Sequence, residues 1–190
     1  MPLRCIDKDG LKDETALRGY RLIEKYSEKG FIPKEDIDEE LLLFFDSEKL
    51  AFPVNSQKDS LSWGMRILTL QDLEIPYIIR EVVKTSCDWK KAVADYFRKI
   101  GEKEPENFVK IVGDLIFQRK GFLISGDTIT SIARKYGKDG GAVIAELKGA
   151  GIISPYSGCG RAVSKLEKIY GSPLYEINRF LMKLVEKSFI

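Results

Sequence analysis

The strongest constraint on the fold is a pair of short helical patterns that a glycine separates, between residues 126 and 151. Apolar side chains recur at the spacing of one helix face in each pattern. They are Ile129, Ile132, Ala133 and Tyr136 in the first, and Val143, Ile144, Leu147 and Ala150 in the second. Gly137 ends the first pattern, Asp139 stands where it can cap the second, and Gly151 can take the left-handed conformation that stops a helix. The sequence therefore predicts a helix, a tight turn and a second helix.

Short apolar segments flank this pair. A run Phe-Leu-Ile follows Gly121, and the segments IISP (152–155) and PLYEIN (173–178) read as strands separated by a long loop. Pro105 is typical of a helix start, and Asn178 is placed to begin a final helix. The order over residues 105–178 resembles that of the winged helix-turn-helix superfamily. The residues that carry the resemblance are TITSIARKYG (128–137) and AVIAELKGAGIIS (142–154), with a glycine turn and a Leu-x-x-x-Gly-Ile-Ile exit into the wing.

The N-terminal part has its own pattern of elements. Helical spacing predicts a helix over 13–28, and Pro33 opens a second, acidic one. The segments KLAFPV (49–54) and LSWGMRIL (61–68) then flank a polar turn, which predicts a hairpin. This order of two helices and a hairpin predicts a second, winged-helix-like region over residues 11–70. Two amphipathic helices are predicted between Pro76 and residue 102.

These elements define the expected fold class, which is mainly α with some β (α+β): a multi-helix protein with a C-terminal winged helix-turn-helix domain. The segment GEKEP (101–105) is the best boundary, and it divides the chain into an N-terminal region (1–102) with helices and a hairpin and a C-terminal domain (103–190) that ends in a helix.

Composition narrows the functional classes. The 190 residues are 44% hydrophobic and 32% charged, no stretch has 18 consecutive apolar residues, and the first residues lack the apolar core of a signal peptide. We therefore expect a cytoplasmic protein without a membrane partner. The chain has no histidine, and its cysteines (Cys5, Cys87 and Cys159) have no CxxC spacing. This excludes imidazole-based catalysis and predicts no metal site and no cofactor.

The content of Asn and Gln indicates what kind of organism the protein comes from. Asn and Gln number three each while Lys, Glu and Ile are abundant, which is typical of a thermophilic protein, and in style the chain resembles an archaeal one. In a thermophile a disulfide among the three cysteines is compatible with the cytoplasm, so their redox state stays open.

Charge is unevenly distributed along the chain. Residues 1–60 carry a net charge of −4, residues 61–102 carry +1, and residues 103–190 carry +5. If the long loop is helical, residues 161, 165 and 168 share one face of it. The predicted DNA-binding residues are the cations of the two-helix unit and of this loop: Arg134, Lys135, Lys138, Lys148, Arg161, Lys165 and Lys168. Such side chains bind phosphates, which gives affinity but no sequence choice.

The tip of the second helix limits what this unit can recognise. The resemblance places the base-contacting residues of the superfamily at Asp139, Gly140, Gly141 and Ala142. None is an Arg, Lys, Asn or Gln that pairs with base edges in the major groove. We therefore expect contacts to the DNA backbone rather than to bases.

Three functions remain open. The first is a non-enzymatic protein that binds double-stranded DNA, a transcriptional regulator that dimerises through its C-terminal helix. The second is a winged-helix subunit that binds a protein partner in a larger complex, which the bare helix tip and the acidic N-terminal region favour. The third is a magnesium-dependent nuclease built on the Glu146-Leu147-Lys148 triplet with Asp127 and Asp139, which would require that triplet on a strand.

Overall fold

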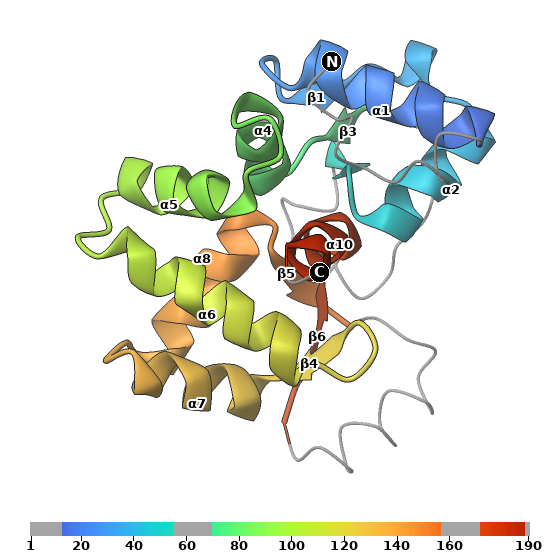
Figure 1. The fold of residues 1–190 in the computed structure, drawn as a ribbon. Coiled ribbons are helices and arrows are strands. Elements are labelled where there is room, and N and C mark those ends of the chain that lie inside the picture. Colours follow the sequence, from blue (N-terminus) through green and yellow to red (C-terminus); the bar gives the residue numbers. More distant parts are fainter. Residues whose placement is uncertain (1–12, 55–69, 157–171, 189–190) are drawn as a thin grey trace.

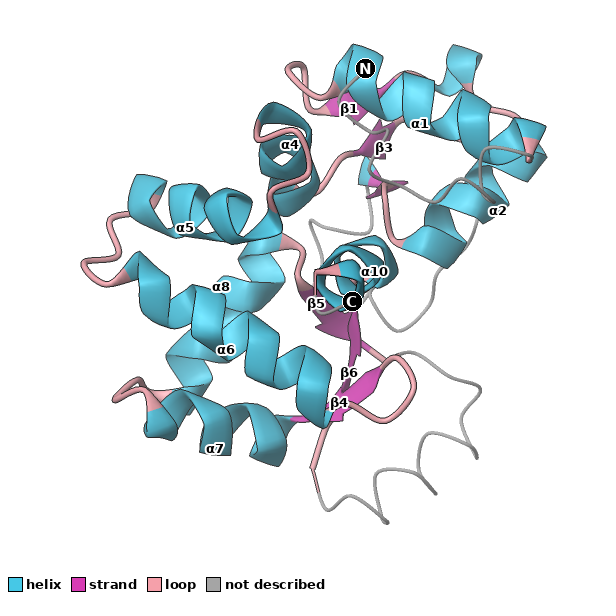
Figure 2. Cartoon of the chain, viewed as in Figure 1, coloured by secondary structure: helices cyan, strands magenta, loops and turns pink. Residues whose placement is uncertain are grey.

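The computed structural model describes residues 13–54, 70–156 and 172–188. These residues form eight α-helices, one short 3-10 helix and two three-stranded antiparallel sheets, which confirms the predicted class, mainly α with small sheets (Figures 1 and 2). No helix within the described ranges is long and apolar enough to cross a membrane.

The C-terminal half has the predicted order of elements. Its elements are α6 (Pro105–Gln118), β4 (Leu123–Ser125), α7 (Gly126–Lys135), α8 (Gly140–Ala150), β5 (Ile153–Pro155) and β6 (Leu174–Ile177). The strands pair antiparallel in the order β4-β6-β5, with Ile124 opposite Tyr175 and Ser154 opposite Glu176. The order along the chain is therefore helix, strand, helix, helix, strand, strand, and residues 156–173 connect β5 to β6.

The N-terminal half repeats this order. Its elements are α1 (Glu14–Tyr26), β1 (Phe31–Ile32), the 3-10 helix η3 (Lys34–Asp36), α2 (Glu39–Glu48), β2 (Phe52–Pro53) and β3 (Leu73–Glu74). Its sheet has the order β1-β3-β2, which matches β4-β6-β5 strand for strand. By position, η3 corresponds to α7 and α2 corresponds to α8.

Two predicted elements of this half differ from the structure. The acidic helix was expected from Pro33, but α2 begins only at Glu39, because the side chain of Asp38 accepts a hydrogen bond from the backbone N–H of Leu41 and sets the helix start. The third strand lies at 73–74, beyond the predicted region 11–70. The alternating segment 61–68 lies outside the described residues.

Three further helices join the two halves. They are α4 (Tyr77–Lys84) and α5 (Trp89–Lys99), as predicted after Pro76, and α10 (Arg179–Lys187) at the C-terminal end. The apolar face of α10 is buried through Phe180, Leu181 and Leu184, and α10 contacts α2, α5 and α6 (Figure 1). Buried apolar residues from both halves form one continuous core. The dimer through the C-terminal helix stays a prediction, and the buried apolar residues of α10 are used within the chain.

Cys87 is the cysteine that the described residues include. It is half-buried after α4, has a left-handed backbone (φ 71°), and is disulfide-bonded. Cys5 and Cys159 lie outside the described residues.

A buried polar junction lies where the two halves meet. The Asn178 side chain, 2% exposed, caps α10 by accepting a hydrogen bond from Leu181 N–H. Its Nδ2 donates to the carbonyls of Lys49, at 2.8 Å, and Gly151, at 3.2 Å, which are the residues that end α2 and α8. Beside it, the Lys49 ammonium lies 3.4 Å from the Glu176 carboxylate, and both side chains are more than nine-tenths buried. One side chain thus connects three helices.

We predict that Asn178→Ala lowers the free energy of unfolding by about 2–4 kcal/mol, because it removes a helix cap and leaves two buried carbonyls without a donor. Asn178→Asp keeps the cap acceptor but places a buried carboxylate oxygen against the two carbonyl oxygens, so it should lose at least as much. Asn107→Ala is the matched control, because Asn107 bonds only an exposed carboxylate of Glu104. Urea unfolding monitored by circular dichroism measures all three, and equal losses for Asn107 and Asn178 would contradict the central role of the junction.

Candidate nucleic-acid interface

The corner between α7 and α8 is shaped by a close approach of the two helices. Ser125 caps α7, Asp139 caps α8 by accepting from Ala142 N–H, and Gly137 turns the chain with a φ of 69°. A Cβ on Gly140 would lie 2.6 Å from the side chain of Thr130 on α7. Glycine at the helix tip is therefore a packing requirement of this corner.

The outer face of α8 is almost without side chains. Gly141, Ala142, Ala145 and Gly149 are exposed along it. At its C-terminal end, Gly151 has a φ of 78°, and a Cβ there would lie 2.5 Å from Pro76, ahead of α4. The helix can approach a partner surface closely, but this face has no group that reads base edges.

Two of the predicted DNA-binding cations form ion pairs with carboxylates of the same chain. Lys135 lies 2.8 Å from Asp114 of α6, which also accepts a hydrogen bond from the Tyr136 hydroxyl. Lys138, in the turn, lies 2.6 Å from Glu102, and both side chains are largely buried. This hydrogen bond raises the pKa of Lys138 and, with a backbone N–H donor, lowers the pKa of Glu102. Both lysines hold the corner to α6 and the loop before it.

The other predicted cations divide into two groups. Arg134, in the last turn of α7, is exposed, and Lys148, in the last turn of α8, is half-buried; neither has an ion pair with any described residue. Arg161, Lys165 and Lys168 lie outside the described residues, in the connection between β5 and β6. That connection leaves the sheet beside the start of α7, because Gly126 N–H donates to Pro173 O and Asp127 N–H to the Ser172 hydroxyl.

The nuclease triplet is part of a helix. Residues 140–150 form α8, and Leu147 is fully buried on its inner face. Burial raises the pKa of Glu146, and the nearby Glu102 raises it further. Asp139 is used as a helix cap, and within the described ranges no group of three acidic, histidine or cysteine side chains could hold a metal ion. The strand on which the nuclease geometry depends is therefore not formed by these residues.

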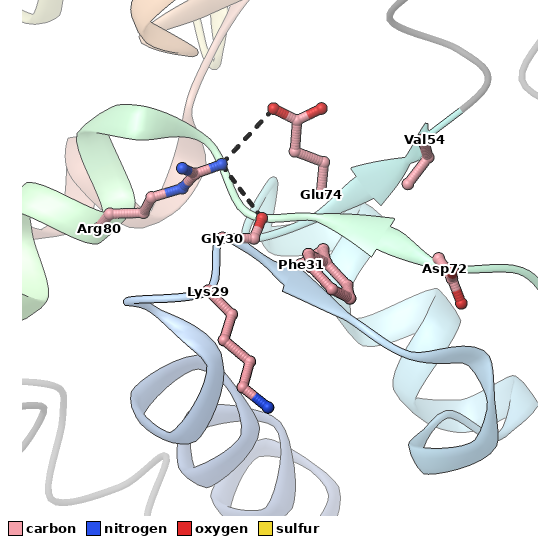
Figure 3. Close-up of a pocket in the computed structure, with 7 residues that line it drawn as sticks. All are labelled: Lys29, Gly30, Phe31, Val54, Asp72, Glu74 and Arg80. Atoms are coloured by element: carbon pink, nitrogen blue, oxygen red, sulfur yellow. Dashed lines mark hydrogen bonds and ion pairs between the residues drawn. The ribbon is translucent and has the colours of Figure 1, made fainter.

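Two surface pockets in the N-terminal half were not predicted from the sequence. One, of about 350 Å³, lies at the edge of the β1-β3-β2 sheet (Figure 3). Its Arg80 guanidinium donates to the carbonyls of Ile75 and Gly30 and lies 3.5 Å from Glu74, so it is used within the protein. The other, of about 330 Å³, lies along α1 and is lined by three cations. Their spacing, Arg18, Arg21 and Lys25, was the signal that could have revealed this pocket.

The glycines of α8 give a matched pair of variants. We predict that Gly140→Ala destabilises the protein by roughly 1–3 kcal/mol, because the new methyl group collides with Thr130. Gly141→Ala should be near neutral or stabilising by up to about 1 kcal/mol, since alanine favours the helix and only the Asp139 carboxylate, 3.3 Å away, must adjust. Thermal and urea unfolding of both variants test this, and similar effects at the two positions would disprove the packing argument.

The Lys138–Glu102 pair predicts a pH dependence of stability. Because the pKa of Glu102 is lowered in the folded protein, Glu102 stabilises the fold at pH values above the pKa of an unfolded glutamate, about 4.3. This stabilisation is lost as the pH falls through the pKa of Glu102 in the folded protein. Because the pKa of Lys138 is raised, Lys138 stabilises the fold at pH values below the pKa of an unfolded lysine, about 10.4. This stabilisation is lost as the pH rises through the pKa of Lys138 in the folded protein.

We therefore expect Lys138→Met to cost about 1–2 kcal/mol near neutral pH and less at either extreme. Glu102→Gln, Lys138→Met and the double variant, unfolded in urea at several pH values, measure the coupling. A coupling that does not change between pH 3 and pH 7 would contradict this assignment.

Comparison with known proteins gave a family and no individual relative. No curated protein and no solved structure matches the chain. A protein-family model matches residues 5–188, which is nearly its whole length. The chain belongs to this family, an uncharacterised one that is named after an Archaeoglobus protein.

Proposed function

We propose that the C-terminal half is a member of the winged helix-turn-helix superfamily and that the protein is a non-enzymatic transcriptional regulator that binds double-stranded DNA. The observation that carries the proposal is the position of the basic loop. Arg161, Lys165 and Lys168 lie in the connection between β5 and β6, where a winged helix has its wing, in a half with the full order of elements of that fold.

The contacts are to the phosphate backbone. Along the outer face of α8 the exposed residues after the cap Asp139 are glycine and alanine, which favours close approach to a backbone and offers no base readout. Arg134 and Lys148 add two cations that no described carboxylate neutralises. Lys135 and Lys138 contribute less, because each already binds a carboxylate of its own chain.

A specific observation supports a protein partner as the second candidate. In the N-terminal half, α2 occupies the position that α8 has in the C-terminal half, yet it exposes Glu39 and Glu40. Leu43, one turn further along the same face, is 60% exposed. Carboxylates at this position repel phosphates, whereas an exposed leucine among them suits a protein surface.

DNA binding by phosphate contacts predicts a steep salt dependence. The logarithm of the association constant for duplex DNA should fall linearly with the logarithm of salt concentration, by about 0.9 per phosphate neutralised. Replacing Arg161, Lys165 and Lys168 together by Gln should reduce that slope by about 2.7, and Arg134→Gln by about 0.9. Lys91→Gln, an exposed change on α5, should leave the slope unaltered. Fluorescence anisotropy with random and genomic duplexes measures each slope.

The same titration separates the alternatives. Similar affinity for both kinds of duplex is the result expected from backbone contacts. Absent or salt-insensitive binding would reject the DNA proposal and select the protein-binding candidate. DNA cleavage that requires Mg²⁺ and disappears in Glu146→Ala would select the nuclease.

A further inference from the structure

The pocket along α1 combines cations with an apolar floor. Arg18, Arg21 and Lys25 occupy one face of the helix, and Leu22 lies between them. The rest of the lining is Leu41 of α2, which is only 1% exposed, and the carboxylate of Asp36. A site of this composition fits an acidic surface that also presents an apolar side chain.

The charges of this pocket are only partly compensated within the chain. Arg18 binds Asp38, and Lys25 lies 2.9 Å from Asp36. Arg21 is exposed and has neither a hydrogen bond nor an ion pair with a described residue. One full positive charge is therefore available to an incoming group, and Arg18 and Lys25 are only partly used.

The complementary surface is the outer face of α2. Leu43 follows Glu39 and Glu40 at i+4 and i+3, so the leucine and both carboxylates share one face. Glu40 accepts a hydrogen bond from the Thr15 hydroxyl at 3.2 Å, which places the start of α2 beside the start of α1. Neither glutamate has an ion pair within 4 Å among the described residues, although Glu40 lies close enough to Arg18 to contribute to its raised pKa. The acidic face and the basic pocket thus lie next to each other on one molecule.

We propose that a second copy of this chain docks here, with Leu43 of each copy entering the α1 pocket of the other. A two-fold axis makes both contacts at once, because a patch with two complementary parts side by side is self-complementary. Arg21 of one copy then lies against Glu39 and Glu40 of the other. A contact made by one pair of helices per copy is small, so the dimer should be weak, with a dissociation constant on the order of micromolar.

The composition of the pocket favours this occupant over nucleic acid. A phosphate backbone would meet the cations but has no apolar group to cover the half-buried Leu22. The carboxylates and the leucine of a second α2 match both the charges and the floor. The larger pocket of Figure 3 offers no such match, because its Arg80 is bonded to Gly30 O, Ile75 O and Glu74.

Two opposite charge reversals test the dimer. Arg21→Glu places like charges at both symmetric contacts, and so does Glu39→Arg, so each variant alone should raise the dissociation constant at least about tenfold. An equimolar mixture of the two variants restores opposite charges at both contacts and should form a heterodimer. Sedimentation velocity of the full chain over a micromolar concentration series measures these states, and rising salt should weaken the native dimer.

The controls address folding and location. Thermal melts should show that both variants are folded, since neither side chain has an ion pair with a described residue. Lys91→Glu on α5 makes the same charge change as Arg21→Glu at another exposed site and should leave the dissociation constant within about twofold. A native protein that is monomeric throughout, a dimer that survives both reversals, or a mixture that stays monomeric would each overturn the proposal.

Discussion

The arrangement of the two halves depends on the side chain of Asn178. Its amide donates to the carbonyl groups of Lys49 and Gly151, and both of these residues end a helix in the left-handed conformation. Those helices, α2 and α8, occupy equivalent positions in the repeated order of elements. The junction therefore brings together the C-terminal ends of the two equivalent helices. Because α8 has 11 residues, its tip lies about 16 Å from this point and remains at the surface.

Close packing at the two ends of α8 explains Gly140 and Gly151. Gly151 ends the helix against Pro76, and Gly140 begins it against Thr130 of α7, so both ends are fixed by close contacts that a Cβ would prevent. The missing side chain at Gly140 is thus a consequence of how α8 is held, whereas Gly141 has space for a methyl group. A helix positioned in this way can present its backbone to a partner surface, but the same contacts leave no space at Gly140 for a residue that would read bases.

The sequence patterns were informative where one element determines its own structure. The bounds of α8 follow from apolar spacing, from the cap Asp139 and from Gly151, and Gly137 marks the end of α7, whereas the cap of α7, Ser125, is seen only in the structure. The ion pairs could not be predicted, because Lys138 and Glu102 are separated by 36 residues and meet only when the turn between α7 and α8 lies against the loop before α6. The late start of α2 shows a competition between two signals, in which the cap at Asp38 prevails over Pro33.

These pairings change how the charge of the C-terminal half is interpreted. A net charge of +5 over residues 103–190 suggests a broad positive field, yet Lys135 and Lys138 are neutralised by Asp114 and by Glu102, which lies just before that range. Unpaired charge in the described part of the predicted interface is concentrated at Arg134 and Lys148, at the C-terminal ends of α7 and α8. A surface of this kind attracts phosphates at a few points rather than along a stripe. The proposed binding of DNA would therefore depend mainly on the cations that the sequence places between β5 and β6.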